Sequence, residues 1–535
     1  MSNWDETKQY HQYSKHGYHR SAPGPGYMDW ENQPDPFRRY DGTEKIKLKK
    51  ISLNEGPLFY EALQPKEIPA FPLNFTTLSQ LFFDSLAISA WKSFQGSKWA
   101  LRVNPSSGNL HPTEGYLICG PIEGINSSPS VSHYCPRTHG LEIRTTFSNQ
   151  TWKQMGFHEN TFFIGLSSIY WREAWKYGLR AFRYCHHDMG HALAAINIAG
   201  AVLGWRTQLM DHLGGEELEI VLGLNKKNAD EIEVPNCLIA VTPQEDVITI
   251  KSRDFVAGFS DLKWLGEPNT LSNDHMDWHG ITEVSQATQK PHTENSQNFK
   301  RGALPDLLQE DPFPIRKAIH QRRSAVAMDG KTRITSETFY QFMAKTIPEA
   351  CPLPFQTFPW DPQIHLGLFI HRVDGLAEGL YFLVRNNNHL SDLKTKLKKD
   401  FVWAKPENCP ENLDLFLLQE GDVRGIATSV SCGQEIAGKG CFSLGMISAF
   451  ENASLNYGPW MYPRLYWECG AIGQMLYLQA EVSGIRSTGI GCFFDDPVHD
   501  VFGIENRSYQ SLYHFTVGGA VEDTRLTTLP PYEDD

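Results

Sequence analysis

Residues 181–205, AFRYCHHDMGHALAAINIAGAVLGW, are the stretch that most restricts the fold of this chain. Apolar and small residues cover most of the circumference at helical spacing, so the stretch predicts a long helix that is buried on nearly every side. We expect the helix to run over 172–205 and to end near Gly204, because glycine is common just past a helix end. Residues 464–483, RLYWECGAIGQMLYLQAEVS, have the same character and predict a second buried helix.

The two helices belong to an internal repeat of the sequence. A shift of 280 residues aligns residues 162–224 with residues 442–504 without a gap. Identity is low, but glycines and charged positions coincide: Gly165 with Gly445, Gly190 with Gly470, Gly204 with Gly484, Gly223 with Gly503, Asp188 with Glu468, and Arg206 with Arg486. Glycine marks tight turns and close backbone approaches, so glycines in register predict that the two copies share their geometry.

Each copy shows helical, strand and hairpin patterns in a similar order, which predicts an α+β fold. Hairpins are expected at residues 132–143 and 379–393, where strand patterns with an aromatic flank a polar turn. Residues 266–302 are polar with little periodicity, and we interpret them as a linker with the domain boundary near residue 300. The linker separates an N-terminal domain, 1–265, from a C-terminal domain, 303–535. Two copies in one chain suggest a fused dimer, and interfaces of such dimers often hold ligands.

Composition narrows the class of protein. The chain has 535 residues, of which 41% are hydrophobic and 21% are charged, and its formal net charge is −13. This length predicts two domains, and the lack of a basic block argues against general nucleic-acid binding. No apolar run approaches the ~18 residues of a membrane span, and the N-terminus lacks the apolar segment of a secretory signal. Ten cysteines without CxxC spacing indicate reduced thiols in a cytoplasmic protein and no structural zinc site.

Two stretches are candidates for ligand binding. Residues 102–112, RVNPSSGNLHP, are mostly small or hydrogen-bonding, which suits a loop laid against a polar, planar ligand. Residues 320–330, HQRRSAVAMDG, place two arginines and a serine after a helical pattern. Arginine forks match phosphate oxygens, but a solvated basic turn explains this second stretch equally well.

Residues 487–496, STGIGCFFDD, hold two glycines in an apolar run. This pattern fits either a bulged strand or a backbone that a ligand must approach closely. Residues 186–191, HHDMGH, set His187 and His191 at i, i+4 spacing on one helix face. The second copy has Trp467 and Ala471 there, so we favour buried core histidines over metal ligands and predict no metal.

Residues 173–184, EAWKYGLRAFRY, place Lys176 beside Tyr177. A solvated lysine next to a packing tyrosine is the simplest interpretation. A buried lysine with a lowered pKa beside a phenol would instead form a proton-transfer pair.

Several of these stretches together resemble the nitroreductase superfamily of flavin enzymes. They are NPSSGNLHPTEGYLI (104–118), WKYGLRAFRY (175–184) followed by GH (190–191), HRVDGLAEGLYFL (371–383), RRS (322–324) and GIGCFFDD (489–496). The branch resembled is that of the SagB-type dehydrogenases, which include flavin oxidases that convert azolines to thiazoles and oxazoles in modified peptides. The resemblance covers most of both halves and is that of a tandem-domain form of the family.

The resemblance implies FMN bound between two units of a dimer-like fold. The implied cofactor residues are Arg322, Arg323 and Ser324 at the phosphate, Gly491 and Cys492 on the strand that faces flavin N5, the loop residues Pro105, Ser106, Ser107 and Asn109, and a late basic residue, Arg525. The implied catalytic pair is Lys176 and Tyr177. One departure from the family is Val326, where a basic residue is frequent.

The duplication is not symmetric in these residues. The second half has PFQTFPWDPQIHLG (354–367) in place of the PSSGN loop, and the first half has LMDHLGGE (209–216) in place of GIGCFFDD. The first half's arginine pair at 38–39 lacks the serine, and the second half has Asn456 where the first has Lys176. One complete site can therefore be assembled per chain, which predicts one FMN at the interdomain interface.

The sequence favours an FMN-dependent oxidoreductase in which Lys176 or Tyr177 takes a substrate proton and flavin N5 takes the hydride. The expected partner is a small-molecule or modified-peptide substrate, and a chain that is its own pseudo-dimer can work as a monomer. Two alternatives stay open: an NAD(P)H-dependent nitroreductase-like enzyme, and a degenerate flavin-binding scaffold without turnover. Substrate and electron acceptor are not encoded in any motif.

Overall fold

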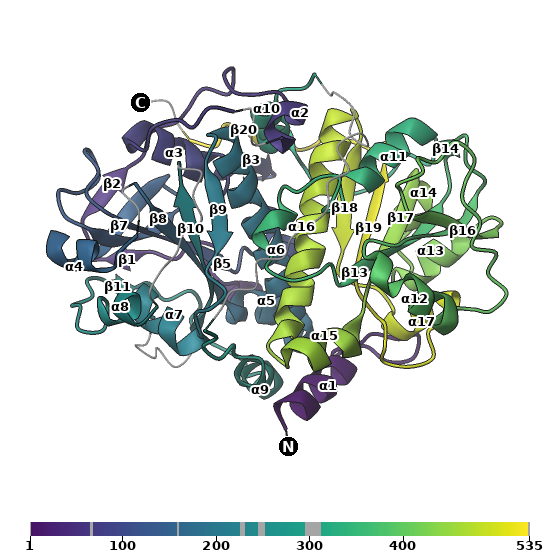
Figure 1. Ribbon diagram of the computed structural model, residues 1–535, viewed down its shortest axis with the longest axis horizontal. Coiled ribbons are helices and arrows are strands. Elements are labelled where there is room, and N and C mark those ends of the chain that lie inside the picture. Colours follow the sequence, from purple (N-terminus) through teal and green to yellow (C-terminus); the bar gives the residue numbers. More distant parts are fainter. Residues whose placement is uncertain are drawn as a thin grey trace.

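The computed structural model describes residues 2–64, 68–157, 160–224, 231–243, 252–294 and 312–532. It shows two antiparallel sheets, one from each half of the chain, on either side of two long central helices (Figure 1). The predicted boundary near residue 300 and the last part of the predicted linker, residues 295–302, lie outside the described residues. Mixed helices and antiparallel sheets agree with the predicted α+β class.

The two large sheets have corresponding strand orders. The first runs β2 (Lys45–Lys47), β7 (Gly140–Thr146), β6 (Ser130–Cys135), β5 (Thr113–Cys119), β8 (Phe162–Ile169), β10 (Glu233–Thr242), β9 (Arg206–Leu209). The second runs β16 (Leu415–Glu420), β15 (Gly379–Leu383), β13 (Ile364–Ile370), β17 (Phe442–Ser448), β19 (Gln510–Gly518), β18 (Arg486–Ile490). Apart from the extra edge strand β2, each strand of the first sheet has a counterpart at the same place in the second.

The helices follow the same correspondence and keep the 280-residue offset. The pairs are α5 (Tyr170–Tyr177) with α15 (Phe450–Tyr457), α6 (Ala181–Val202) with α16 (Met461–Val482), and α7 (Gly215–Leu222) with α17 (Asp495–Phe502). Both long helices are almost entirely buried, as predicted. The first is shorter than predicted because Gly178, at φ 53°, ends α5 and a 3-10 turn, η3 (Gly178–Arg180), precedes α6.

Helices α6 and α16 pack directly on each other at the centre of the molecule (Figure 1). A Cβ atom at Gly190 would lie 2.2 Å from the carbonyl oxygen of Trp467, and one at Gly470 would lie 2.2 Å from that of His187. Only glycine permits this backbone approach. The paired glycines of the repeat therefore mark the helix crossing, and the largest buried apolar cluster takes side chains from both halves.

Each half also sends its terminal segments across to the other. Helix α1 (Asn3–Tyr13) packs against the C-terminal half, where the ring centroids of Trp4 and Phe450 are 5.6 Å apart. In return, β20 (Thr527–Leu529) pairs with β3 (Ile88–Phe94), which pairs with β4 (Ser97–Arg102) of the N-terminal half. Arg316 on α10 (Ile315–Gln321) forms a buried ion pair with Asp84, 2.6 Å between Nε and Oδ2.

The described part of the predicted linker, residues 266–294, is structured, in contrast to the expected surface crossing. Strand β11 (Glu267–Pro268) pairs with β1 (Tyr40–Asp41), and helix α9 (His279–Ala287) buries Ile281 and Val284. The helix is short, so its i, i+3 apolar spacing was hidden in a polar composition.

One predicted hairpin is confirmed and the other is wrong. Strands β6 and β7 pair across the turn at 136–139, as expected for residues 132–143. In residues 379–393, β15 is followed instead by a 3-10 turn, η6 (Asn387–His389), and helix α12 (Leu390–Lys396). Asn386 accepts a hydrogen bond from Asn388 N and caps this turn, so the asparagine run starts a helix rather than a second strand.

The remaining elements lie around these layers. They are α2 (Phe59–Leu63), α3 (Phe75–Phe83), α4 (Asn149–Gln154), α8 (Ser252–Ala257), α11 (Ser336–Ala344), α13 (Arg424–Val430), α14 (Ile436–Lys439), and the parallel pair β12 (Ile334–Thr335) and β14 (Val373–Asp374). Among the described residues, no helix is long and apolar enough to cross a membrane.

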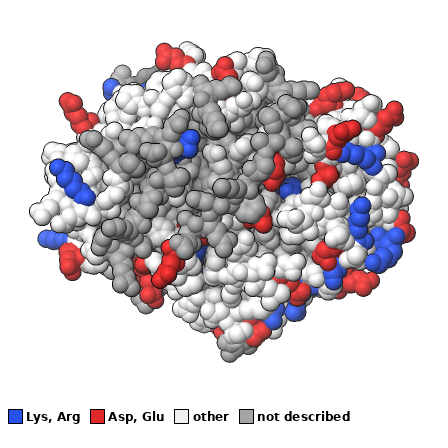
Figure 2. All heavy atoms as spheres, in the orientation of Figure 1, with Lys and Arg blue, Asp and Glu red and all other residues white. Residues whose placement is uncertain are grey.

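The described surface of the C-terminal half carries both signs of charge close together (Figure 2). Exposed ion pairs contribute to this mixture, for example Arg424 with Asp422 and Lys439 with Glu435. Interspersed charges screen one another, so this face carries no strong single-sign field.

Candidate functional site

The loop between β4 and β5 is hydrogen-bonded to the central helix α6. Its 3-10 turn, η2 (Ser107–Asn109), includes Gly108 and Asn109 at positive φ. Asp188 on α6 accepts hydrogen bonds from the backbone N–H of Ser107 (3.0 Å) and from its hydroxyl (3.1 Å). Ser106 Oγ accepts from the N–H of His111, so polar side chains that we expected to face a ligand also fix the loop itself.

The predicted catalytic pair lies against this loop. Tyr177 is the last residue of α5, and a Cβ atom at Gly108 would lie 2.5 Å from the Tyr177 hydroxyl oxygen, so the loop backbone and the phenol are in close contact. The Nζ of Lys176 lies 5.2 Å from the centroid of the Tyr177 ring. Burial, followed by the nearby carboxyl of Glu173, raises the pKa of Tyr177 far above its usual range and keeps the phenol protonated at neutral pH.

Two tyrosines connect the loop to the C-terminal half. The ring centroids of Tyr177 and Tyr184 are 4.7 Å apart at a near-perpendicular angle. A Cβ atom at Gly491 would lie 2.6 Å from Cε1 of Tyr184, so the end of β18 approaches that ring as closely as only glycine allows. The PSSGN loop, the Lys–Tyr pair and the Gly491 strand end therefore meet around these two rings.

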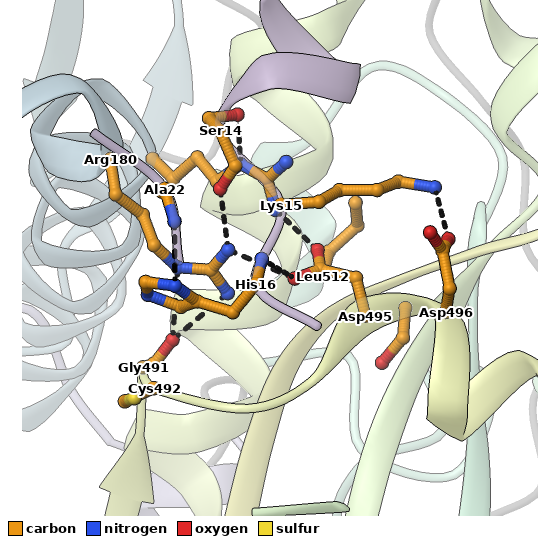
Figure 3. Close-up of polar contacts among 12 residues, drawn as sticks. Ser14, Lys15, His16, Ala22, Arg180, Gly491, Cys492, Asp495, Asp496 and Leu512 are labelled. Atoms are coloured by element: carbon orange, nitrogen blue, oxygen red, sulfur yellow. Dashed lines mark hydrogen bonds and ion pairs between the residues drawn. The ribbon is translucent and has the colours of Figure 1, made fainter. Parts of the chain in front are cut away.

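A buried arginine fixes the peptide between Gly491 and Cys492 (Figure 3). The guanidinium of Arg180 donates from Nη2 to the Gly491 carbonyl (3.1 Å) and from Nη1 to Asp495 Oδ2 (2.9 Å). Because a trans peptide is planar, fixing this carbonyl turns the N–H of Cys492 the opposite way. Sequence reasoning missed Arg180 because its role depends on a contact between residues far apart in the chain.

The N-terminal segment after α1 completes the same network (Figure 3). Lys15 Nζ lies 2.7 Å from Asp496 Oδ1, and the N–H of His16 donates to Asp495 Oδ2 (3.0 Å). Burial alone would raise the pKa of Asp495, but the charges of Arg180 and Arg183 hold it well below its usual range. The Asp495 carboxylate is therefore ionised at neutral pH, and it binds both arginines and the N-terminal segment that follows α1.

Positive charge gathers at the start of β18. Arg322 is buried, its Nη2 donates to the carbonyl of Arg102 (3.0 Å), and its guanidinium lies 5.0 Å from the Tyr477 ring centroid. The hydroxyl groups of Ser324 and Tyr477 are hydrogen-bonded to each other (2.7 Å). Burial, with the charge of Arg322 as the next cause, lowers the pKa of Arg323 to about 10.

Arg525 does not join this cluster. Its guanidinium is exposed, pairs with Asp523 (2.7 Å) and lies 5.6 Å from the Phe94 ring centroid. Arg486 lies there instead: it forms an ion pair with Glu481, which also accepts from the N–H of Arg323. The match of Arg206 with Arg486 in the repeat was the signal that could have identified it.

Two buried carboxyls lie behind the loop and were also missed. Burial raises the pKa of Asp188 to about 7, although the hydrogen bonds from Ser106 and Ser107 oppose this shift. Burial, and then the charge of Asp188, raise the pKa of Glu173 well above its usual range, and both Glu173 carboxyl oxygens are buried without a hydrogen-bond partner. The match of Asp188 with Glu468 in the repeat carried this signal. Glu468 likewise accepts hydrogen bonds from backbone N–H groups, those of Gln363 and Ile364 at the start of β13.

The phosphate end of this arrangement fits FMN in donors and charge. Arg322, Arg323 and Arg486 lie near two carboxylates, Glu481 and the exposed Glu522, whose Oε1 is 3.9 Å from Arg486 Nε, which leaves one positive charge in excess. The Nε of Arg322 and the hydroxyl of Ser487 are buried without a hydrogen-bond partner in the structure. A phosphate dianion would supply both the missing negative charge and the missing acceptors.

The position related by the 280-residue shift carries different side chains. Asp211 stands where the second copy has Gly491, and Arg464 stands where the first copy has Tyr184. These two residues form an ion pair of 3.3 Å, and the Arg464 guanidinium lies 4.7 and 4.8 Å from the ring centroids of Trp460 and Trp467. Neither the glycine nor the tyrosine of the first position is present here.

The histidines of residues 186–191 have protein partners. His187 Nε2 hydrogen-bonds the carbonyl of Leu512 (3.0 Å), and His191 Nδ1 hydrogen-bonds the side chain of Gln474 (3.2 Å). Over the described ranges, no group of three or more potential metal ligands gathers.

Comparisons with known proteins point to one fold. No known family profile matches the sequence. A protein of Methanocaldococcus jannaschii whose name assigns it to the nitroreductases is 22% identical over 189 residues, which are 34% of this chain and 87% of that protein. A solved structure from Anabaena variabilis, also named as a nitroreductase, matches with a TM-score of 0.69 at 22% identity and covers 96% of this chain and 99% of its own. The fold is therefore nitroreductase-like.

Proposed function

We propose that this chain is an FMN-dependent oxidoreductase of the SagB-type dehydrogenase kind, with one active site between two nitroreductase-like repeats. The observation that carries the proposal is the meeting of separate segments at one place. Gly108, Tyr177 and Tyr184 of the N-terminal half contact one another and reach Gly491 of the C-terminal half. At the other end of β18 lies a cluster of three arginines, Arg322, Arg323 and Arg486.

In this proposal the chain is an internal pseudo-dimer of residues 1–265 and 303–535. The equal strand order of the two sheets and the constant helix offset support it. The exchanged segments α1 and β20 support it as well, because each half then needs the other for its packing. A relative that matches one third of the chain, and a structure that matches nearly all of it, are the pattern expected of a tandem form.

Different residues of the chain would bind different parts of FMN. Arg322, Arg323 and Ser324, with Arg486, would hold the phosphate, since the three arginines outnumber the two nearby carboxylates, Glu481 and Glu522. The loop residues Pro105, Ser106, Ser107 and Asn109 would lie along the flavin ring, pre-organised by Asp188. The peptide of Gly491 and Cys492, oriented by Arg180, would face N5.

Bound FMN would supply the hydride-accepting centre. Tyr177 is held protonated by burial and packs against Gly108, so it can donate a hydrogen bond or a proton to a group bound over the loop. Lys176 beside it would take the substrate proton. The substrate class proposed is a small molecule or a modified peptide with an oxidisable C–H bond.

The experiment is the absorbance spectrum of the purified protein with its Arg322→Ala variant as comparison. The proposal predicts a flavin spectrum in the wild type and loss of bound FMN in the variant at unchanged far-UV circular dichroism. Substrate oxidation without added NAD(P)H is the expected mode of turnover. Colourless protein that does not take up added FMN would refute the proposal, and anaerobic bleaching by NADPH would replace the dehydrogenase with a nitroreductase-like enzyme.

A further inference from the structure

Two cysteines that are distant in sequence lie together beside Gly491. Cys492 follows this glycine, and its Sγ lies 2.6 Å from Sγ of Cys432, in the turn between α13 and α14. Forming an S–S bond of ~2.05 Å from this position needs a sulfur movement of only about half an ångström. Cys492 is exposed and Cys432 is partly exposed, so reagents in solution can reach them.

Each of the other eight cysteines lacks solvent access or a neighbouring thiol. Seven are buried: Cys119, Cys135, Cys185, Cys237, Cys351, Cys441 and Cys469. The eighth, Cys409, is partly exposed but contacts the carbonyls of Pro410 and Leu413. Among the described cysteines, Cys432 and Cys492 are thus distinguished because their sulfurs are close together and both residues are accessible to solvent.

The surroundings of Cys492 favour its thiolate, which is the reactive form of cysteine. The hydrogen bond with Cys432, aided by the nearby charge of Arg180, lowers the pKa of Cys492 to about 7. The backbone on both sides is already fixed: Gln434 Nε2 donates to the Cys492 carbonyl (2.9 Å), and Phe494 N–H donates to the Val430 carbonyl (2.7 Å). The two sulfurs are therefore held close by contacts that do not involve them.

We propose that Cys432 and Cys492 form a thiol–disulfide exchange site whose substrates are low-molecular-weight disulfides of the glutathione class. The Cys492 thiolate attacks one sulfur of the small disulfide, forms a mixed disulfide and releases one thiolate. The Cys432 sulfur, losing its proton, then attacks the sulfur of Cys492, forms the intrachain bond and releases the second thiolate. Two protein thiols are oxidised, one small disulfide is reduced to two thiols, and the two protons go to the released thiolates.

This reaction does not require flavin, so its test is separate from the test of the proposed function. The closed bond would join the α13–α14 turn to the residue after Gly491, whose carbonyl Arg180 holds. The oxidation state of Cys432 and Cys492 would then affect the position of the Gly491–Cys492 peptide, which we assign to the flavin face.

The test uses the full chain equilibrated in buffers of varied reduced-to-oxidised glutathione ratio, quenched with acid and alkylated. Mass spectrometry then counts free thiols and maps the linked peptides. We expect a loss of two alkylated thiols in oxidising buffer, one peptide pair linking residues 432 and 492, and full recovery in reducing buffer. The Cys432→Ser variant should instead retain glutathione on Cys492, because the second attack is missing.

The matched control is Cys409→Ser, which removes the other partly exposed thiol and should behave as wild type. Cys492→Ser should abolish both the intrachain bond and the adduct, and far-UV circular dichroism shows whether each variant is folded. Full alkylation of Cys432 and Cys492 in oxidising buffer would overturn the proposal. An equal glutathione adduct in wild type and Cys432→Ser, or a bond to any other cysteine, would overturn it as well.

Discussion

The crossing of α6 and α16 allows a sharp test of how the two halves are held together. In the Gly190→Ala variant the new methyl carbon would lie 2.2 Å from the Trp467 carbonyl oxygen and 2.7 Å from its carbonyl carbon. An ordinary C···O contact is about 3.3 Å, so the helices must separate by roughly 1 Å. Neither neighbour is a movable side-chain end, and a gap of this size forfeits roughly a quarter to a half of each dispersion contact along the crossing.

Overpacking of this kind costs about 1–3 kcal/mol or more, while alanine gains about 1 kcal/mol of helix propensity over glycine. Gly200→Ala is the matched control, because it has the same propensity gain on the same helix but its nearest neighbour is a methyl of Thr207 at 3.1 Å. Because the propensity gain cancels, we expect the free energy of unfolding of Gly190→Ala to be about 1–3 kcal/mol lower than that of Gly200→Ala, measured by urea denaturation followed by tryptophan fluorescence. Equal stability of the two variants would refute the close backbone crossing.

Three further predictions concern the site. The pKa of Asp188 is raised from 3.8 to about 7, so its contribution to stability is complete below the unfolded pKa and is lost as pH rises through the folded one. From pH 5 to 8 the wild type should therefore lose about 2–3 kcal/mol relative to Asp188→Asn, and parallel urea midpoints would contradict this. Lys176→Ala should abolish turnover and leave the yellow colour, whereas unchanged turnover would remove the proton-transfer role. Arg322→Ala should weaken FMN binding about a hundredfold in a fluorescence titration, as expected for removing a buried partner of a charge, and a change as large in Arg525→Ala would contradict the exposed position of that side chain.

The sequence repeat contained more of the fold than its low identity suggests. Glycines carried most of this information, because Gly190 and Gly470 mark the helix crossing while Gly204 and Gly484 take positive φ just past the ends of the long helices. Helix α9 and the break at Gly178 were not predictable, since a short amphipathic helix in a polar stretch and a turn between two helices leave weak periodicity.

The candidate site shows a different limit of sequence reasoning. The resemblance supplied the residues of the loop, the Lys–Tyr pair and the arginine grip, but not what holds them. Asp188 fixes the loop from across α6, and Arg180 fixes the Gly491 carbonyl from the other half of the chain. Such supporting contacts join residues by folding alone, so only the repeat match of Asp188 with Glu468 hinted at one of them.

The most direct test of the central claim is the number of FMN molecules bound per chain. Flavin released from the purified, FMN-saturated protein can be counted by absorbance against protein measured by amino-acid analysis. One FMN per chain is the expected result, because the related position has Asp211 in place of Gly491 and Arg464 in place of Tyr184, and it lacks the PSSGN loop. Two FMN molecules per chain, or none after saturation, would contradict a single interdomain flavin site.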